Sequence, residues 1–168
     1  GESVEGEEDP SLAATRGQVE AFAEKELTSR VSRWRTALVL SNAERDELAA
    51  VLAALPVTLR WRELDVVARK RLLGGPYWDQ VRRLASALAD RPGVEALLEK
   101  LEPEADALLA EGVSPDPLLD GSDLIDLGVE PGPKLGEALE ALYDAQLAGE
   151  ISDRPAAEAW MRDYLEAE

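Results

Sequence analysis

Carboxylates are the most numerous groups able to do chemistry, because the chain has 35 Asp and Glu residues but no His and no Cys. Asp123 and Asp126 are spaced three apart, and Glu102, Glu104 and Asp106 lie close together in sequence. Two carboxylates can act as acid and base when one has a shifted pKa, and several can hold Mg²⁺ beside a phosphate. No Asp-x-Asp follows a predicted strand, however. We therefore predict solvated helix faces and caps, with no catalytic and no metal-binding residue.

The absence of His and Cys excludes whole classes of chemistry. Without them there is no Ser-His or Cys-His nucleophile, no thiolate metal site and no disulfide framework. The sequence therefore predicts that this chain is not an enzyme by itself and needs no cofactor of its own.

The positive charges are concentrated in the middle of a chain whose net charge is −17. Residues 28–92 carry twelve cations and seven acids, net +5, whereas residues 1–27 have net −6 and residues 93–168 net −16. One cationic face could contact RNA phosphates. The competing interpretation is that these arginines pair with nearby acids on solvated helix faces.

Two glycine-containing turns, 74–76 and 132–136, precede expected helices and could expose N–H groups to an anion. Such turns more often only start a helix. Trp34 and Trp61 each lie between two arginines, which suits base stacking, but their apolar helical spacing favours the core. The residues predicted to bind RNA are Arg60, Arg62, Arg69, Lys70, Arg71, Arg82, Arg83, Gly132, Lys134 and Gly136.

Helix formers and apolar residues at helical spacing predict an all-α array of seven to nine helices without a sheet. A capping box begins one helix at Ser41 and Glu44, Pro56 ends it, and Pro103 kinks or restarts another. Asp153 or Ser152 should cap the last helix. The expected helices are 11–27, 30–40, 42–55, 58–73, 77–90, 93–110, 123–128, 134–151 and 154–168.

Composition predicts four segments. Residues 1–10 read as a disordered tag or linker, 11–110 as a helical body, 111–121 as a linker rich in Pro and Gly, and 122–168 as a C-terminal helical tail unit. No apolar run could span a bilayer and no signal peptide opens the chain, so we expect a cytoplasmic protein with no membrane partner. The first residue, Gly1, indicates a cut fragment.

Residues 121–151 resemble the tail of class II tRNA nucleotidyltransferases (CCA-adding enzymes) and of related bacterial poly(A) polymerases. The run PLLDG at 117–121 and, more loosely, LSNAERDEL at 40–48 and RKRLL at 69–73 resemble the approach to that tail and the preceding body. The matching tail residues are Gly121, Asp123, Leu124, Leu127, Gly128, Pro131, Gly132, Pro133, Gly136, Gly149, Glu150 and Ile151.

This resemblance implies a non-catalytic C-terminal piece that positions tRNA or other RNA for 3′-end nucleotide addition. The chemistry, with Mg²⁺ and ATP or CTP, would belong to a head and neck domain whose motifs this chain lacks. DNA is not an expected partner. The alternative is an acidic helical protein-interaction or scaffold module without RNA affinity. Whether the parent adds CCA or poly(A) stays open.

Overall fold

The computed structural model describes residues 10–21, 33 and 40–167, and throughout this part of the chain the regular structure is helical. No strand occurs among these residues, so the predicted all-α architecture is confirmed. None of the described helices combines the length and apolar character needed to cross a membrane.

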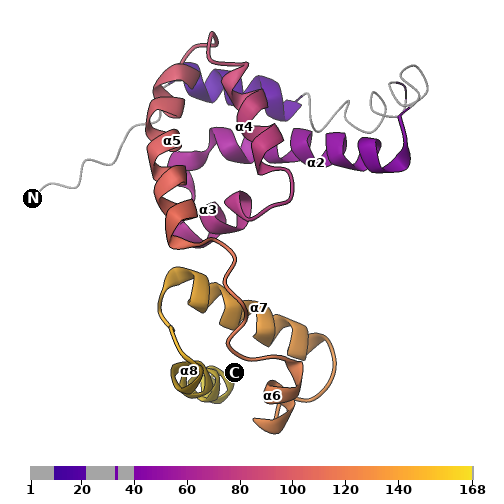
Figure 1. Ribbon diagram of the computed structural model, residues 1–168, viewed down its shortest axis with the longest axis vertical. Coiled ribbons are helices and arrows are strands. Elements are labelled where there is room, and N and C mark those ends of the chain that lie inside the picture. The colour runs from indigo at the N-terminus through magenta and orange to yellow at the C-terminus, as the bar shows by residue number, and fades with distance from the viewer. Residues whose placement is uncertain (1–9, 22–32, 34–39, 168) are drawn as a thin grey trace, which may run out of the picture.

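The first hydrophobic core is enclosed by the N-terminal elements (Figure 1). These are the helical segment 10–21, α2 (Asn42–Leu59), the short 3-10 helix η1 (Trp61–Glu63), α3 (Val66–Leu73), α4 (Trp78–Ser86) and α5 (Val94–Glu111). Its buried residues are Leu12, Val51, Leu59, Trp61, Leu73, Trp78, Val81, Val94, Leu97, Leu101 and Ala105.

A second core lies among α6 (Gly121–Asp126), α7 (Pro133–Ala148) and α8 (Arg154–Ala167). Figure 1 shows this group beyond the first, joined to it by the segment after α5. The predicted 111–121 linker lies between most residues of the two cores, but Leu119 within it belongs to the second core. The predicted division into a body and a tail unit stays a prediction. The buried residues are Leu119, Leu124, Val129, Ala138, Leu142, Ala145, Ile151, Ala157 and Met161.

Helix α2 begins as predicted and ends later than predicted. The Ser41 hydroxyl accepts from Glu44 N at 3.2 Å and the Glu44 carboxylate accepts from Ser41 N at 2.8 Å, so the capping box is confirmed. Pro56 does not end the helix, which continues to Leu59. The extra turn buries Thr58, whose hydroxyl donates to Ala54 O at 3.0 Å, together with Leu59.

The single helix predicted over 58–73 is wrong, because the chain turns between α2 and α3. Asp65 caps α3 by accepting a hydrogen bond from Ala68 N at 2.8 Å, which fixes an extended residue in the middle of the predicted helix. Val66, at the start of α3, is 39% exposed. Trp61 lies in η1 and is completely buried, so its assignment to the core is confirmed.

The later helices follow the predicted order with shifted bounds. Helix α4 ends at Ser86, and residues 87–90 form turns instead of completing the expected helix 77–90. Helix α5 runs unbroken through Pro103, so a restart there is wrong; Leu101 and Ala105 on either side are buried. Asp153 caps α8 by accepting from Ala156 N at 2.9 Å.

Gly93 caps the start of α5, and Leu12 of segment 10–21 packs closely against it. Its φ is +79°, and a Cβ added there would lie 2.8 Å from Leu12 Cβ and 2.9 Å from Leu12 N. We expect Gly93→Ala to destabilise the protein by about 2 kcal/mol or more, because left-handed strain of about 1–2 kcal/mol combines with a backbone clash. Urea unfolding followed by circular dichroism measures this loss.

Gly112→Ala is the matched control for that change. Gly112 also has a positive φ, +99°, but a Cβ there would meet nothing within 4 Å. It should show the left-handed strain alone. Equal losses in the two variants would contradict the close approach of Leu12 to Gly93.

Candidate nucleic-acid interface

The predicted RNA-binding residues around η1 are held by other parts of the first unit. Arg60 Nε donates to Glu63 Oε2 at 2.9 Å, and Glu63 also accepts from Arg16. These two arginines lower the pKa of the Glu63 carboxyl, chiefly through the hydrogen bond from Arg60. Arg62 donates to Ala96 O in the first turn of α5 at 3.3 Å. Arg60 is therefore neutralised by a carboxylate, whereas Arg62 meets only a carbonyl.

Arg69 on α3 lies over the buried Trp61. Its Cζ is 5.2 Å from the indole ring centroid, and its Nε donates to Trp61 O at 3.2 Å. Its Nη1 also donates to Glu104 Oε2 at 3.2 Å, and the same oxygen accepts from Trp61 Nε1 at 2.8 Å. The arginine and the tryptophan thus meet one another and α5, which is a packing arrangement and not an open stacking platform for a base.

Lys70 and Arg71 join the two units at the contact between α3 and α7. Lys70 Nζ donates to Leu147 O at 2.9 Å, near the C-terminal end of α7, where a cation is favoured. Arg71 Nε lies 2.8 Å from Asp144 Oδ1, and its Cζ lies 6.0 Å from the ring centroid of Tyr143. These cations bind the second unit of the same chain.

The C-terminal part of α7 also contacts the segment that connects the two units. Tyr143 Oη donates to Pro115 O at 3.2 Å, and Gln146 Nε2 donates to Asp116 O at 2.8 Å. The side-chain oxygen Oε1 of Gln146 accepts a hydrogen bond from Leu118 N at 3.2 Å. One helical end therefore contacts both α3 and the connection.

The two adjacent arginines on α4, Arg82 and Arg83, differ in their contacts. Arg82 forms ion pairs with Glu102 and, at 3.3 Å, with Asp106, both on α5, and the hydrogen bond to Glu102 raises the pKa of its guanidinium. Arg83 is exposed, and no ion pair or side-chain hydrogen bond joins it to the described residues. Arg82 is thus paired with carboxylates of α5, whereas the adjacent Arg83 remains available for other contacts.

The two glycine turns differ in what they do. Gly132 precedes α7, Lys134 is exposed in its first turn, and a Cβ at Gly132 or Gly136 would meet nothing within 4 Å. In the other turn, a Cβ at Gly74 would lie 2.4 Å from Ser114 Oγ, so this glycine permits the connection to approach α3. The turn at 74–76 is thus a packing site, whereas the turn before α7 is open.

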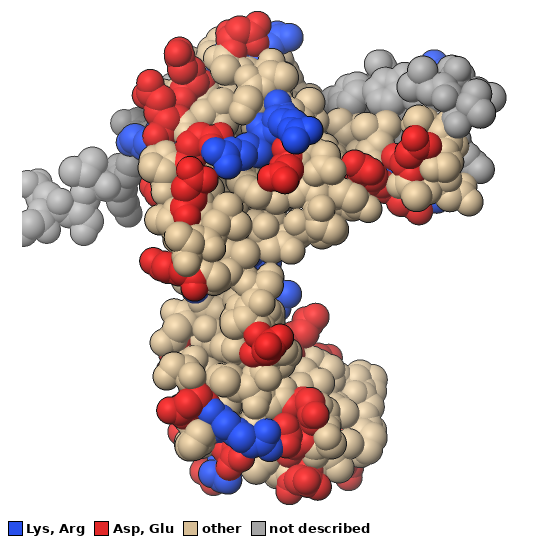
Figure 2. All heavy atoms as spheres, viewed as in Figure 1, with Lys and Arg blue, Asp and Glu red and all other residues tan. Residues whose placement is uncertain are grey.

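Among the described residues, four of the central cations, Arg60, Arg69, Arg71 and Arg82, are paired with carboxylates. Figure 2 shows the basic side chains on the visible face in separate groups bordered by acidic ones. Acidic residues of α5 meet these cations: Glu104 pairs with Arg69, and Glu102 and Asp106 pair with Arg82. Arg33 is exposed, and its neighbours Arg30, Trp34 and Arg35 lie outside the described residues.

Sequence reasoning missed the partners of these arginines. Glu104 is 35 positions from Arg69, and Asp144 is 73 positions from Arg71. The i, i+4 rule detects pairs within one helix and gives no signal for pairs between helices.

The acidic pair Asp123 and Asp126 has no catalytic geometry. Asp120 and Asp123 form a capping box at α6: Asp120 accepts from Asp123 N at 3.1 Å, and Asp123 accepts from Asp120 N at 2.9 Å and from Arg154. These contacts lower the pKa of Asp123, first through the Asp120 N–H, whereas a general acid needs a raised pKa. Across residues 10–21, 33 and 40–167, no three potential ligands converge on a metal position.

The capping box should make the second core sensitive to acid. The pKa of Asp120 is lowered in the folded state, chiefly by the Ser122 hydroxyl. Its contribution to stability is therefore present above the unfolded pKa, near 3.8, and is lost as the pH falls through the lower folded pKa. We expect Asp120→Asn, which keeps a capping oxygen without a titrating group, to flatten the loss of stability between about pH 5 and pH 3.

Urea unfolding at several pH values, followed by circular dichroism, measures that slope. Asp163→Asn, an exposed change on α8 outside the box, is the control. An Asp120→Asn protein with the parent's slope would show that the cap is not the acid-sensitive group.

The chain is similar to a curated protein over part of its length. It is 32% identical over 102 residues to the A-adding tRNA nucleotidyltransferase of Deinococcus radiodurans. The match includes 60% of this chain, which spans about a fifth (21%) of the length of that curated relative. No protein-family model and no solved structure matches the chain. The similarity supports a relationship to the tRNA nucleotidyltransferases over part of the chain.

Proposed function

We propose that this chain is a non-catalytic C-terminal part of a tRNA nucleotidyltransferase, and that it helps to position tRNA while another domain adds the nucleotide. The observation that carries the proposal is the 32% identity to an A-adding enzyme. Mg²⁺ and the nucleotide would be bound by that other domain. In this view the parent is an enzyme and this chain alone is not.

Its RNA contacts would be few, because most of the predicted cations already have partners. Of the residues predicted to bind RNA, Arg62 and Arg83 are exposed and meet no carboxylate among the described residues, and Lys134 lies at the open turn before α7. Contacts to phosphates can position an RNA without reading its sequence. Each neutralised phosphate releases counterions, so two contacts, by Arg62 and Arg83, would give a log–log salt slope of roughly −1.5 to −2.

Titration of fluorescently labelled tRNA into the chain at low salt tests this proposal. We expect weak association that the double change Arg62→Glu and Arg83→Glu abolishes. Arg162→Glu is the matched control, because this exposed arginine on α8 is paired with Glu158 within one helix. Absence of association at any salt concentration, or equal losses in both variants, would contradict it. Incubation with tRNA, ATP, CTP and Mg²⁺ should give no 3′ extension.

The ion pairs favour a second candidate function. A net charge of −17 repels RNA, and Arg60, Arg69, Arg71 and Arg82 are each paired with a carboxylate. An acidic helical protein-interaction module without RNA affinity would have these features. Light scattering that detects oligomers, together with indifference to tRNA, would favour this candidate.

A further inference from the structure

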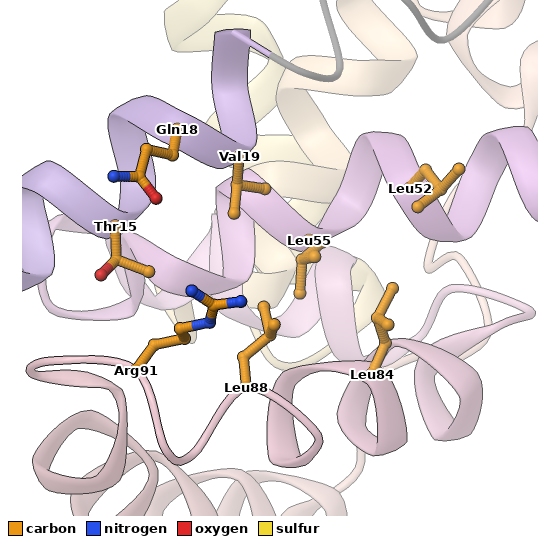
Figure 3. Close-up of a pocket in the computed structure, with 8 residues that line it drawn as sticks. All are labelled: Thr15, Gln18, Val19, Leu52, Leu55, Leu84, Leu88 and Arg91. Atoms are coloured by element: carbon orange, nitrogen blue, oxygen red, sulfur yellow. The ribbon is translucent and has the colours of Figure 1, made fainter. Parts of the chain in front are cut away.

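An apolar cavity of about 360 Å³ lies in the first unit. Three parts of the chain line it: segment 10–21 through Val19, α2 through Leu52 and Leu55, and α4 with its following turn through Leu84 and Leu88 (Figure 3). This volume and apolar lining are typical of small-molecule sites. The cavity is more than twice as large as the roughly 150 Å³ engineered cavity that accepts benzene.

Polar groups collect at one end of this cavity. Figure 3 shows Thr15, Gln18 and Arg91 there, with Leu52 and Leu84 toward the other end. The Thr15 hydroxyl is occupied by Pro92 O at 3.2 Å. Arg91 is exposed, and its guanidinium forms no ion pair or side-chain hydrogen bond with any residue that the structure describes. A cation that finds no carboxylate in so acidic a chain is available to a ligand.

We propose that this cavity binds a small carboxylate with an apolar tail, of the size of a medium-chain fatty acid. The leucines and Val19 would cover the tail, because burying apolar surface drives such binding. The Arg91 guanidinium would hold the carboxylate in a two-pronged contact, a geometry that arginine favours. The Gln18 amide supplies a further donor at the same end. This site is independent of the proposed RNA function.

Isothermal titration calorimetry with decanoate tests the site, with decanamide as the uncharged comparison. We expect one decanoate per chain, with a Kd on the order of 100 µM. Decanamide should bind about tenfold more weakly. Arg91→Gln should weaken decanoate by the same factor and leave decanamide unchanged, whereas the control Arg162→Gln should change neither.

A second variant tests the cavity itself. Leu52 is half-buried on α2, so Leu52→Trp should fill the space and abolish binding of both compounds. Absence of heat with decanoate would overturn the proposal. So would an unchanged decanoate affinity in Arg91→Gln or in Leu52→Trp, or binding of an acidic amphipathic peptide in place of decanoate.

Discussion

Replacement of Trp61 by alanine is expected to lower the free energy of unfolding by about 3–5 kcal/mol. The side chain is fully buried and stacks on Trp78, with ring centroids 6.3 Å apart. Its Nε1 donates to Glu104, and its ring faces Arg69. The alanine variant would leave a cavity and remove the contact on which η1, α3 and α5 converge. Urea unfolding followed by circular dichroism measures the loss.

Phenylalanine substitutions at the two stacked tryptophans separate the hydrogen bond from the packing. Trp61→Phe removes a donor that has a partner, whereas Trp78 Nε1 is buried and finds no partner among the described residues. Trp61→Phe should therefore cost about 0.5–1.5 kcal/mol more than Trp78→Phe, because it removes a formed hydrogen bond, while the exposed Glu104 keeps its contact with Arg69. Equal costs would contradict a stabilising contact between Trp61 and Glu104.

The predictions from sequence were best where a local rule decides the structure. Ser41 with Glu44, and Asp153 before α8, place a capping oxygen near free N–H groups within one turn, and these caps are confirmed. The buried position of Trp61 was also predicted, because its spacing matches an apolar helix face.

Local rules failed where burial outweighed them. Pro56 breaks a helix by intrinsic preference, yet α2 continues because Leu59 and Thr58 become buried. Conversely, the strong helix formers of 58–73 are interrupted, since Asp65 caps a new helix in their midst. At Pro56 burial decides the outcome, whereas at Asp65 a local capping hydrogen bond does.

The candidate site could not be predicted fully, because the acidic partners of its arginines lie far away in the sequence. A cluster of arginines predicts a positive surface only if acids from elsewhere in the chain stay away. Here α5 supplies Glu104 to Arg69, and α7 supplies Asp144 to Arg71. The charge distribution along the sequence therefore overstated the charge available on the surface.

Leu124→Ala is expected to destabilise the second core by about 2–5 kcal/mol while leaving the first core nearly intact. Leu124 is fully buried on the short helix α6, among residues of α7 and α8. The contact between units rests on Lys70 and on the exposed pair of Arg71 with Asp144, and an exposed ion pair contributes only about 0–1 kcal/mol. The loss of stability in the second core should therefore have little effect on the first core.

Hydrogen exchange at individual amides distinguishes local from shared loss of stability. In Leu124→Ala, the amides of α7 and α8 should exchange faster while those of α5 stay protected. Leu97→Ala, at a 1% exposed position of the first core, is the matched variant and should give the reverse pattern. If both variants instead lowered protection equally in all of these helices, the two cores would form one cooperative unit. The contact between α3 and α7, with the connection held by Tyr143 and Gln146, would then be stronger than its exposed ion pair implies.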